Sequence, residues 1–213
     1  MTADATRILL VDDHAIVREG YRRLLEDESG IRVVGEAGNA AQACERARAL
    51  APEVVVMDIA LPATSGIEAT RRMLKEQPQL RILMFSMYDD AIYARRALEA
   101  GALGYLSKAS APEVLVQAIH AVSRGERYFS PDVAANMARS AAQPGKSEIE
   151  ALSPREFEVL RLLVRGETVR SISEKLALSE KTVANHQSII REKLGARNSA
   201  QLARLAAQIG VSG

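Results

Sequence analysis

The chain has 213 residues and a formal net charge of +1, from 28 Lys and Arg against 27 Asp and Glu. At about 150 residues per domain, this length favours two small domains over one large domain. The shares of hydrophobic residues, 47%, and of charged residues, 26%, exclude a disordered or low-complexity chain. Taken over the whole chain, the charge gives no reason to expect a nucleic-acid partner.

The expected compartment follows from the cysteine count and the lengths of the apolar runs. Cys44 is the single cysteine and has no partner for an internal disulfide or a cysteine-rich zinc site, which favours a reducing compartment. The first residues lack the layout of a signal peptide. Apolar runs of about four residues are far shorter than the ~20 that a membrane helix requires. We therefore expect a soluble, cytoplasmic protein with no membrane partner.

In chain order, short apolar runs alternate with amphipathic segments up to about residue 125. Most of the runs are almost continuously apolar, which is typical of strands buried on both faces of a parallel sheet. The predicted strands are 8–11, 31–36, 54–57, 81–85 and 103–106. The predicted helices are about 14–27, 39–50, 66–77, 89–100 and 112–124. Five β–α units predict a doubly wound α/β domain over residues 1–125.

Residues 126–150 are predicted to form a short helix and a linker, because the strand pattern stops after Gly125. Ser130 and Pro131 are a typical helix start, an N-cap residue followed by proline at the first helical position. The polar segment that follows contains Pro and Gly, so we place the linker at about 142–150.

From residue 151 onward the sequence has only helical patterning. Ser153, Pro154 and Glu156 form the start signal of a helix that ends near Gly166. Three further helices are predicted at about 168–176, 180–194 and 198–208. Four short helices predict a small all-α domain over residues 151–213.

Divided between the two parts, the charge is uneven. Residues 151–213 contain ten Lys and Arg against six Glu, whereas residues 1–145 contain 17 Lys and Arg against 19 Asp and Glu. The near-neutral total therefore conceals an acidic-leaning first part and a basic second part.

Polar side chains follow four of the five predicted strands. Asp12 and Asp13 follow the first strand and Asp58 the third, and these strands are neighbours in a parallel sheet of this kind. Carboxylates held close together repel unless they are neutralised, and Mg²⁺ accepts carboxylates, waters and phosphate oxygens. Ser86 and Lys108 add a hydroxyl and an ammonium group to the same rim. This set of groups suits phosphoryl transfer to a carboxylate nucleophile.

Residues 7–124 resemble the receiver domain of two-component response regulators, which has a flavodoxin-like (βα)5 fold. The resemblance rests on ILLVDDH at 8–14, VVVMDIALP at 54–62 with Gly66, FS at 85–86 and GYLSK at 104–108. It implies that Asp58 accepts phosphate from a sensor histidine kinase. It also implies a switch pair, Ser86 and Tyr105, and a phosphoryl-binding Lys108. The implied Mg²⁺ ligands are Asp13, Asp58 and the Ala60 carbonyl, with Asp12 acting through water.

The helix at about 180–194 has two distinct faces. Its inward stripe consists of Val183, His186, Ile190 and Leu194. Its outward face consists of Lys181, Asn185, Ser188 and Glu192, flanked by Ala184 and Arg191. A small, polar face with a cationic start fits the major groove of DNA, where Asn reads adenine. With the short turn at 176–179 before it, this helix has the spacing of a helix-turn-helix unit.

The second part, over 151–208, resembles the LuxR-type helix-turn-helix domain, with LSPRE at 152–156 and KTV at 181–183 among the matching segments. The resemblance places Lys181 and Thr182 on DNA phosphates and directs Ala184, Asn185 and Ser188 toward bases. A receiver followed by this domain resembles a response regulator of the NarL/FixJ type, the group that includes the GacA, UvrY and BvgA regulators.

We therefore predict a DNA-binding transcriptional regulator that is switched by phosphorylation of Asp58. Phosphorylation is expected to favour a homodimer that presents two recognition helices to a two-fold promoter site. Candidates for a self-complementary dimer patch are Leu202, Leu205 and Ala206. The expected partners are the kinase, double-stranded DNA and a second copy of the chain, with RNA polymerase as a further candidate.

Two alternatives stay open. Phosphatases with an aspartate nucleophile use related chemistry, but they need an acid/base aspartate two residues later, where this chain has Ala60. We therefore expect no enzyme activity beyond slow self-dephosphorylation. The other alternative is a constitutive DNA-binding regulator whose receiver serves as a dimerisation module.

Overall fold

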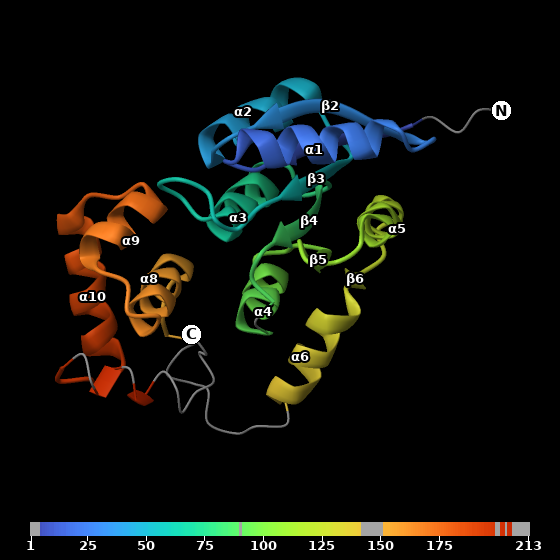
Figure 1. The fold of residues 1–213 in the computed structure, drawn as a ribbon. Helices are drawn as coiled ribbons and strands as arrows, with labels where there is room; N and C mark the ends of the chain where they lie inside the picture. The colour runs from blue at the N-terminus through green and yellow to red at the C-terminus, as the bar shows by residue number, and fades with distance from the viewer. Residues whose placement is uncertain (1–4, 90, 142–150, 199–200, 203, 206–213) are drawn as a thin grey trace. The chain divides into compact units, whose positions relative to one another are not determined.

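The computed structural model describes residues 5–89, 91–141, 151–198, 201–202 and 204–205 (Figure 1). The chain divides into two compact units, residues 1–140 and residues 141–213. We describe each unit by itself.

The first unit contains a six-stranded parallel sheet in the order β2-β1-β3-β4-β5-β6. The strands are β1 (Thr6–Val11), β2 (Ile31–Ala37), β3 (Val54–Met57), β4 (Arg81–Ser86), β5 (Gly104–Ser107) and β6 (Tyr128–Phe129). Val11 pairs with Met57, so β1 and β3 end side by side. This arrangement confirms the predicted flavodoxin-like architecture and brings the residues after β1 and β3 to one edge.

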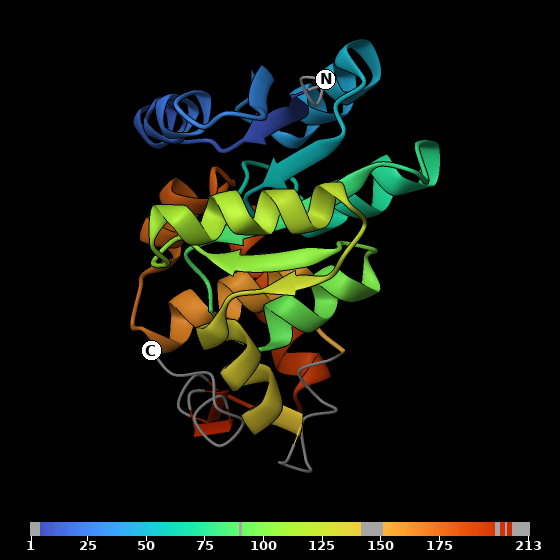
Figure 2. The same ribbon diagram turned by 90° about the vertical axis from the view of Figure 1, so that its right-hand side faces the viewer.

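Helices cover both faces of the sheet. The helices of this unit are α1 (Ala15–Glu26), α2 (Ala40–Leu50), α3 (Gly66–Glu76), α4 (Ala91–Glu99), α5 (Pro112–Ser123) and α6 (Pro131–Ala141). α1 and α5 lie on one face, and α2, α3 and α4 on the other; Figure 2 shows α5 lying along β5 and β6. Alternate residues of the central strands point to opposite faces, and the α1/α5 face buries Ile8, Leu10, Val54, Val56, Leu83 and Phe85.

The sixth strand corrects the sequence analysis, which ended the strands before residue 125. Tyr128 and Phe129 pair in parallel with Gly104 and Tyr105. A strand of two residues carries no periodic pattern, and it forms because α5 returns the chain to the free edge of β5. α6 begins at Pro131, as the sequence predicted.

The second unit contains α8 (Pro154–Val164), α9 (Val169–Leu176) and α10 (Glu180–Lys193). The predicted capping box is present: Ser153 Oγ accepts the Glu156 N–H at 3.2 Å, and Glu156 Oε2 accepts the Ser153 N–H at 2.7 Å. Of the predicted fourth helix, residues 201–202 and 204–205 are helical, and its other residues after 198 lie outside the described part of the chain.

Gly66 allows α3 to begin against the loop that follows β3. A Cβ atom built on Gly66 would lie 1.8 Å from the carbonyl oxygen of Asp58, and main-chain atoms cannot give way as a side-chain tip can. The helix start is fixed nearby by Ser65, whose hydroxyl accepts the Ile67 N–H. Position 66 therefore tolerates only glycine.

We predict that Gly66→Ala lowers the free energy of unfolding of the first unit by about 2 kcal/mol, because the loop that carries Asp58 must shift. Gly20→Ala is the matched control, since Gly20 is an exposed residue of α1 and a Cβ added there would meet no atom within 4 Å; it should raise stability by about 0.5–1 kcal/mol. Urea unfolding followed by tyrosine fluorescence measures both, because all five tyrosines lie in the first unit. A G66A variant as stable as wild type would contradict the close approach.

Candidate functional site

Three carboxylates meet at the carboxyl ends of β1 and β3. Asp12 and Asp58 are buried, at 3% and 4% exposure, and Asp13 is half-buried. The Asp12 N–H donates to the Ala37 carbonyl at 3.0 Å, and the Asp58 N–H donates to the Val11 carbonyl at 2.9 Å. The sheet ladder therefore continues into both aspartates and sets their main chains, as the sequence predicted from the strand ends.

Lys108 joins two of these carboxylates. Its Nζ lies 2.6 Å from Asp58 Oδ2 and 2.5 Å from Asp12 Oδ2, and its side chain is 6% exposed. Its main-chain N–H donates to the Ser86 carbonyl at 2.8 Å, which carries the pairing of β4 and β5 past the end of the strands. One buried ammonium group thus faces two buried carboxylates.

The charges at this site act on one another. Burial raises the pKa of Asp58, and the charge of Asp12 acts in the same direction, whereas Lys108 opposes the shift. Burial also acts to lower the pKa of Lys108, but Asp58 and Asp12 outweigh it and raise that pKa. Lys108 therefore stays charged, and the site contains a fixed cation beside the Asp58 carboxylate.

Ser86 and Tyr105, the predicted switch pair, both bind main-chain groups of Tyr88. Ser86 Oγ accepts the Tyr88 N–H at 3.4 Å, and the Tyr105 hydroxyl donates to the Tyr88 carbonyl at 2.5 Å. Both side chains are buried. Tyr88 is not predicted from the sequence, since a residue bound through its main chain leaves no side-chain signal.

His14 belongs to the acidic cluster. The imidazole Nδ1 of His14 lies 2.7 Å from Asp13 Oδ1 and 3.5 Å from Asp12 Oδ1. The main-chain N–H of His14 donates to Asp12 Oδ1 at 2.8 Å. Asp12, Asp13 and His14 form a group whose ligand atoms lie close enough to hold a metal ion. The carboxylate oxygens fit Mg²⁺, a hard cation that prefers oxygen ligands. Ala60 lies at the same edge, where its N–H donates to Asp58 Oδ1 at 3.2 Å.

In the second unit, α9 and α10 form the predicted helix-turn-helix. Ala177 ends α9 in the left-handed conformation, with φ of 50°, and the Ser179 hydroxyl caps α10 by accepting the Thr182 N–H at 3.1 Å. Val183 and Ile190 are fully buried and seat α10 on its domain.

The predicted DNA-facing side chains differ in exposure. The exposed ones are Lys181, Ala184, Asn185 and Ser188. Thr182 and Arg191 are half-buried: Thr182 Oγ1 lies 2.8 Å from Ser179 Oγ, and Arg191 Nε donates to the Gln187 carbonyl at 3.4 Å. The structure thus presents four of the six predicted contacts openly on one helix.

The predicted dimer patch of Leu202, Leu205 and Ala206 stays a prediction. Leu202 is 2% exposed. Leu205 is half-buried, and Ala206 lies outside the described residues.

Comparison with known proteins decides the family. Residues 8–120 match the response regulator receiver domain, and residues 150–206 match the bacterial regulatory proteins of the luxR family. The chain belongs to the two-component response regulators. It is 40% identical to response regulator UvrY of Escherichia coli K12, over 96% of this chain and 94% of UvrY. It is 39% identical to response regulator GacA of Pseudomonas aeruginosa, over 96% and 97% of the two chains.

Solved response regulators have related structures. A LuxR-family regulator from Aurantimonas has 48% identity and a TM-score of 0.64, covering 66% of this chain and 100% of its own. RcsB from Salmonella enterica serovar Typhimurium, solved on promoter rprA with phosphomimetic BeF3⁻, has 27% identity and a TM-score of 0.65, covering 96% and 99% of the two chains. Among the described residues of our response regulator, no helix is long and apolar enough to cross a membrane.

Glu156 connects the capping box of α8 to α10, because its Oε2 also lies 2.7 Å from Lys193 Nζ of α10. Burial acts to raise the pKa of Glu156, but Lys193 and the Ser153 N–H outweigh it and lower that pKa below the ordinary value of 4.5. A carboxylate with a lowered pKa stabilises the fold above its unfolded pKa, and this contribution is lost as the pH falls through the folded pKa.

We predict that Glu156→Gln destabilises the second unit by about 1 kcal/mol at pH 7, and that this deficit shrinks as the pH falls below about 4.5. Urea unfolding followed by circular dichroism measures the loss, and tyrosine fluorescence of the same samples shows whether the first unit is unaffected. Arg170→Gln, which breaks an exposed ion pair with Glu174, is the control and should change little. A deficit that stays constant from pH 7 to pH 3.5 would exclude the ionic contribution.

Proposed function

We propose that this response regulator controls transcription by DNA binding that is switched when a sensor histidine kinase phosphorylates Asp58. The observation that supports this most directly is the buried Asp58 carboxylate, which lies 2.6 Å from the ammonium of Lys108 at an edge where Asp12 and Asp13 also gather. The match to the receiver domain over residues 8–120 supports the same assignment.

In the proposed reaction, an Asp58 carboxylate oxygen attacks the phosphorus of a phosphohistidine. The new O–P bond forms as the P–N bond to the donor imidazole breaks, and the imidazole leaves with the electron pair. Lys108 places a positive charge where the transferred oxygens gain negative charge. Asp13, Asp58 and the Ala60 carbonyl would hold Mg²⁺, with Asp12 acting through water, and the cation would neutralise the phosphoryl oxygens. Self-dephosphorylation would be slow, since Ala60 offers no acid or base.

The phosphoryl group adds about −1.5 to −2 charges and three acceptor oxygens beside Asp58. We propose that the Ser86 hydroxyl turns to donate to this group and releases the Tyr88 N–H. Because Tyr105 holds the carbonyl of the same residue, it moves with the Tyr88 main chain. Phosphorylation would in this way reach the surface formed by the start of α4.

For the second unit, we propose that α10 enters the major groove of a promoter. Lys181 and Thr182 would contact phosphates, Ala184, Asn185 and Ser188 would face bases, and Arg191 would flank them. The luxR-family match over residues 150–206 supports this role. The related RcsB has been solved as two dimers bound to two parallel DNAs and as an RcsB–DNA complex, which supports DNA binding by this unit.

We further propose that the phosphorylated protein is a homodimer on two-fold DNA sites, that it acts in the cytoplasm, and that RNA polymerase is a candidate partner at the promoter. A two-fold protein matches a two-fold operator, so both recognition helices bind at once. Since Leu202 is buried, Leu205 is the described residue of the predicted patch that remains for such contacts.

The deciding experiment treats wild type and Asp58→Asn with acetyl phosphate and Mg²⁺. Wild type should gain the mass of one phosphoryl group, increase in oligomer mass and bind promoter fragments at least about tenfold more tightly, a difference of about 1.4 kcal/mol. D58N should show none of the three changes. Equal DNA affinity for all samples would support the constitutive alternative, and phosphorylation of D58N would contradict the assignment of the acceptor.

The DNA-binding assignments predict two different losses. Lys181→Ala should weaken binding on all sequences and reduce the salt dependence of the affinity by about one unit, because one phosphate contact is lost. Asn185→Ala should cost about 1–3 kcal/mol and relax selectivity at one base pair. Binding to a panel of single-base operator variants at several salt concentrations separates the two. Arg165→Ala at the end of α8 is the charge-matched control; if it equals K181A, the effect of Lys181 is nonspecific.

A further inference from the structure

Arg18 of α1 reaches the peptide that joins the two adjacent aspartates. Its Nη1 donates to the main-chain carbonyl oxygen of Asp12 at 2.6 Å, and its Nε donates to Glu36 Oε2 at 3.0 Å. The Arg18 side chain is 18% exposed. Because the Asp12 carbonyl belongs to the peptide between Asp12 and Asp13, this one guanidinium holds the plane from which both residues extend.

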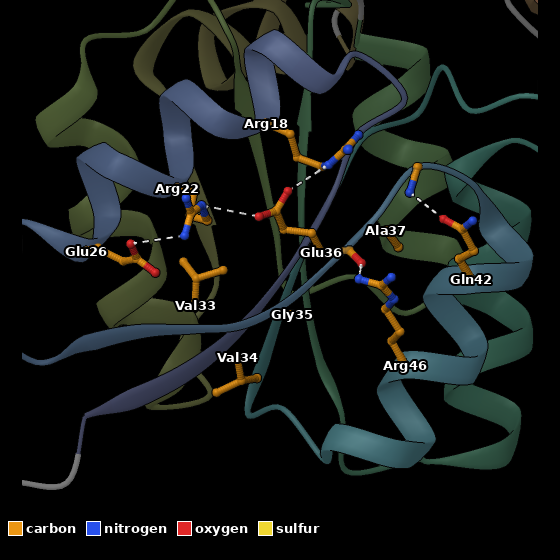
Figure 3. A pocket seen from close by; sticks show the side chains of 11 residues that line it. Arg18, Arg22, Glu26, Val33, Val34, Gly35, Glu36, Ala37, Gln42 and Arg46 are labelled. Atoms are coloured by element: carbon orange, nitrogen blue, oxygen red, sulfur yellow. Dashed lines mark hydrogen bonds and ion pairs between the residues drawn. The ribbon is translucent and has the colours of Figure 1, made fainter.

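The guanidinium is itself held in place by ion pairs along the edge strand β2 (Figure 3). Glu36 also lies 3.3 Å from Arg22 Nε, and Arg22 Nη1 lies 3.6 Å from Glu26 Oε2. Arg46 of α2 donates to the main-chain carbonyl of Glu36. These residues line a hollow of about 460 Å³ beside β2. With its Nε bound to Glu36, the planar fork of Arg18 is oriented toward Asp12 before any ligand arrives.

The main-chain N–H of Asp12 is held by the sheet, where it donates to the Ala37 carbonyl at 3.0 Å. Arg18 and β2 therefore bind the carbonyl and the N–H of Asp12, respectively. The Asp13 side chain is paired with His14, whose side chain is 67% exposed and restrains it weakly. The direction of the Asp13 carboxylate thus depends on the peptide that Arg18 holds.

We infer that Arg18 is a positioning residue for the divalent-cation site, acting on Asp12 and Asp13 through the peptide between them. This inference rests on the Mg²⁺ site of the proposed function. Arg18 itself does not bind the cation, because a guanidinium has no acceptor atom to offer. Groups that orient metal ligands typically change metal affinity by about 10- to 100-fold when they are removed.

The test is a Mg²⁺ titration of the full-length protein by calorimetry. Arg18→Met should raise the Kd by about tenfold, and Arg18→Lys should recover part of this loss, since one ammonium donor can replace the bond to the carbonyl. Arg23→Met is the matched control, because Arg23 lies on the same helix, is exposed and pairs with Glu19 rather than Glu36; its Kd should stay within about twofold of wild type. Saturating Mg²⁺ should restore the rate of phosphorylation of R18M by acetyl phosphate.

An R18M Kd within about twofold of wild type would overturn the inference, and so would an R23M loss as large as that of R18M. If R18M does not fold, Glu36→Gln takes its place, because it weakens the contact that orients Arg18. E36Q should raise the Kd for Mg²⁺ several-fold, and an unchanged Kd would overturn the inference. Wild type that fails to bind Mg²⁺ would instead overturn the metal site of the proposed function, and with it this role of Arg18.

Discussion

The contact between Lys108 and two buried carboxylates is the interaction on which the rest of the first unit depends. Asp12 and Asp58 directly follow neighbouring strands, and bringing two negative charges into a site with 3% and 4% exposure is unfavourable without a cation. Lys108 provides that cation directly after a third strand, β5, 96 residues from Asp12 along the chain. The order of the parallel sheet makes this possible, because it ends β1, β3 and β5 at one edge. The strand order of the sheet therefore determines that the two carboxylates of the site have a cation beside them.

Side chains around this site act largely on main-chain groups. Ser86 and Tyr105 bind the N–H and the carbonyl of Tyr88, and Arg18 binds the carbonyl of Asp12. Gly66 has no side chain because the Asp58 carbonyl occupies the space where its Cβ would stand. A loop that is held through its main chain moves as a unit when one of its partners changes. In the proposed switch, a change at Asp58 would be passed on through these main-chain contacts.

The two units meet opposite electrostatic demands. The first keeps acidic groups together and is suited to a cation and a transferred phosphoryl group, whereas the second carries an excess of Lys and Arg. In the second unit, Glu156 binds both the start of α8 and Lys193 near the end of α10. The Glu156 carboxylate therefore stabilises the start of α8 and also holds α10 against it. The chain's total of +1 is the sum of these two charge distributions.

The sequence by itself determined the architecture and the edge of the sheet that holds the site. Continuous apolar runs, caps such as Ser153 and aspartates directly after strands are local patterns, and local patterns are readable without coordinates. The tertiary structure alone decided the pairing of Tyr128 and Phe129 as β6, the burial of Leu202, and the contacts of Arg18 and Tyr88. Each of these depends on which distant segments the folded chain brings together and on the direction in which a side chain points between them. A two-residue strand or a bond to a carbonyl oxygen leaves no periodic trace in the sequence, because its partner is selected by the fold.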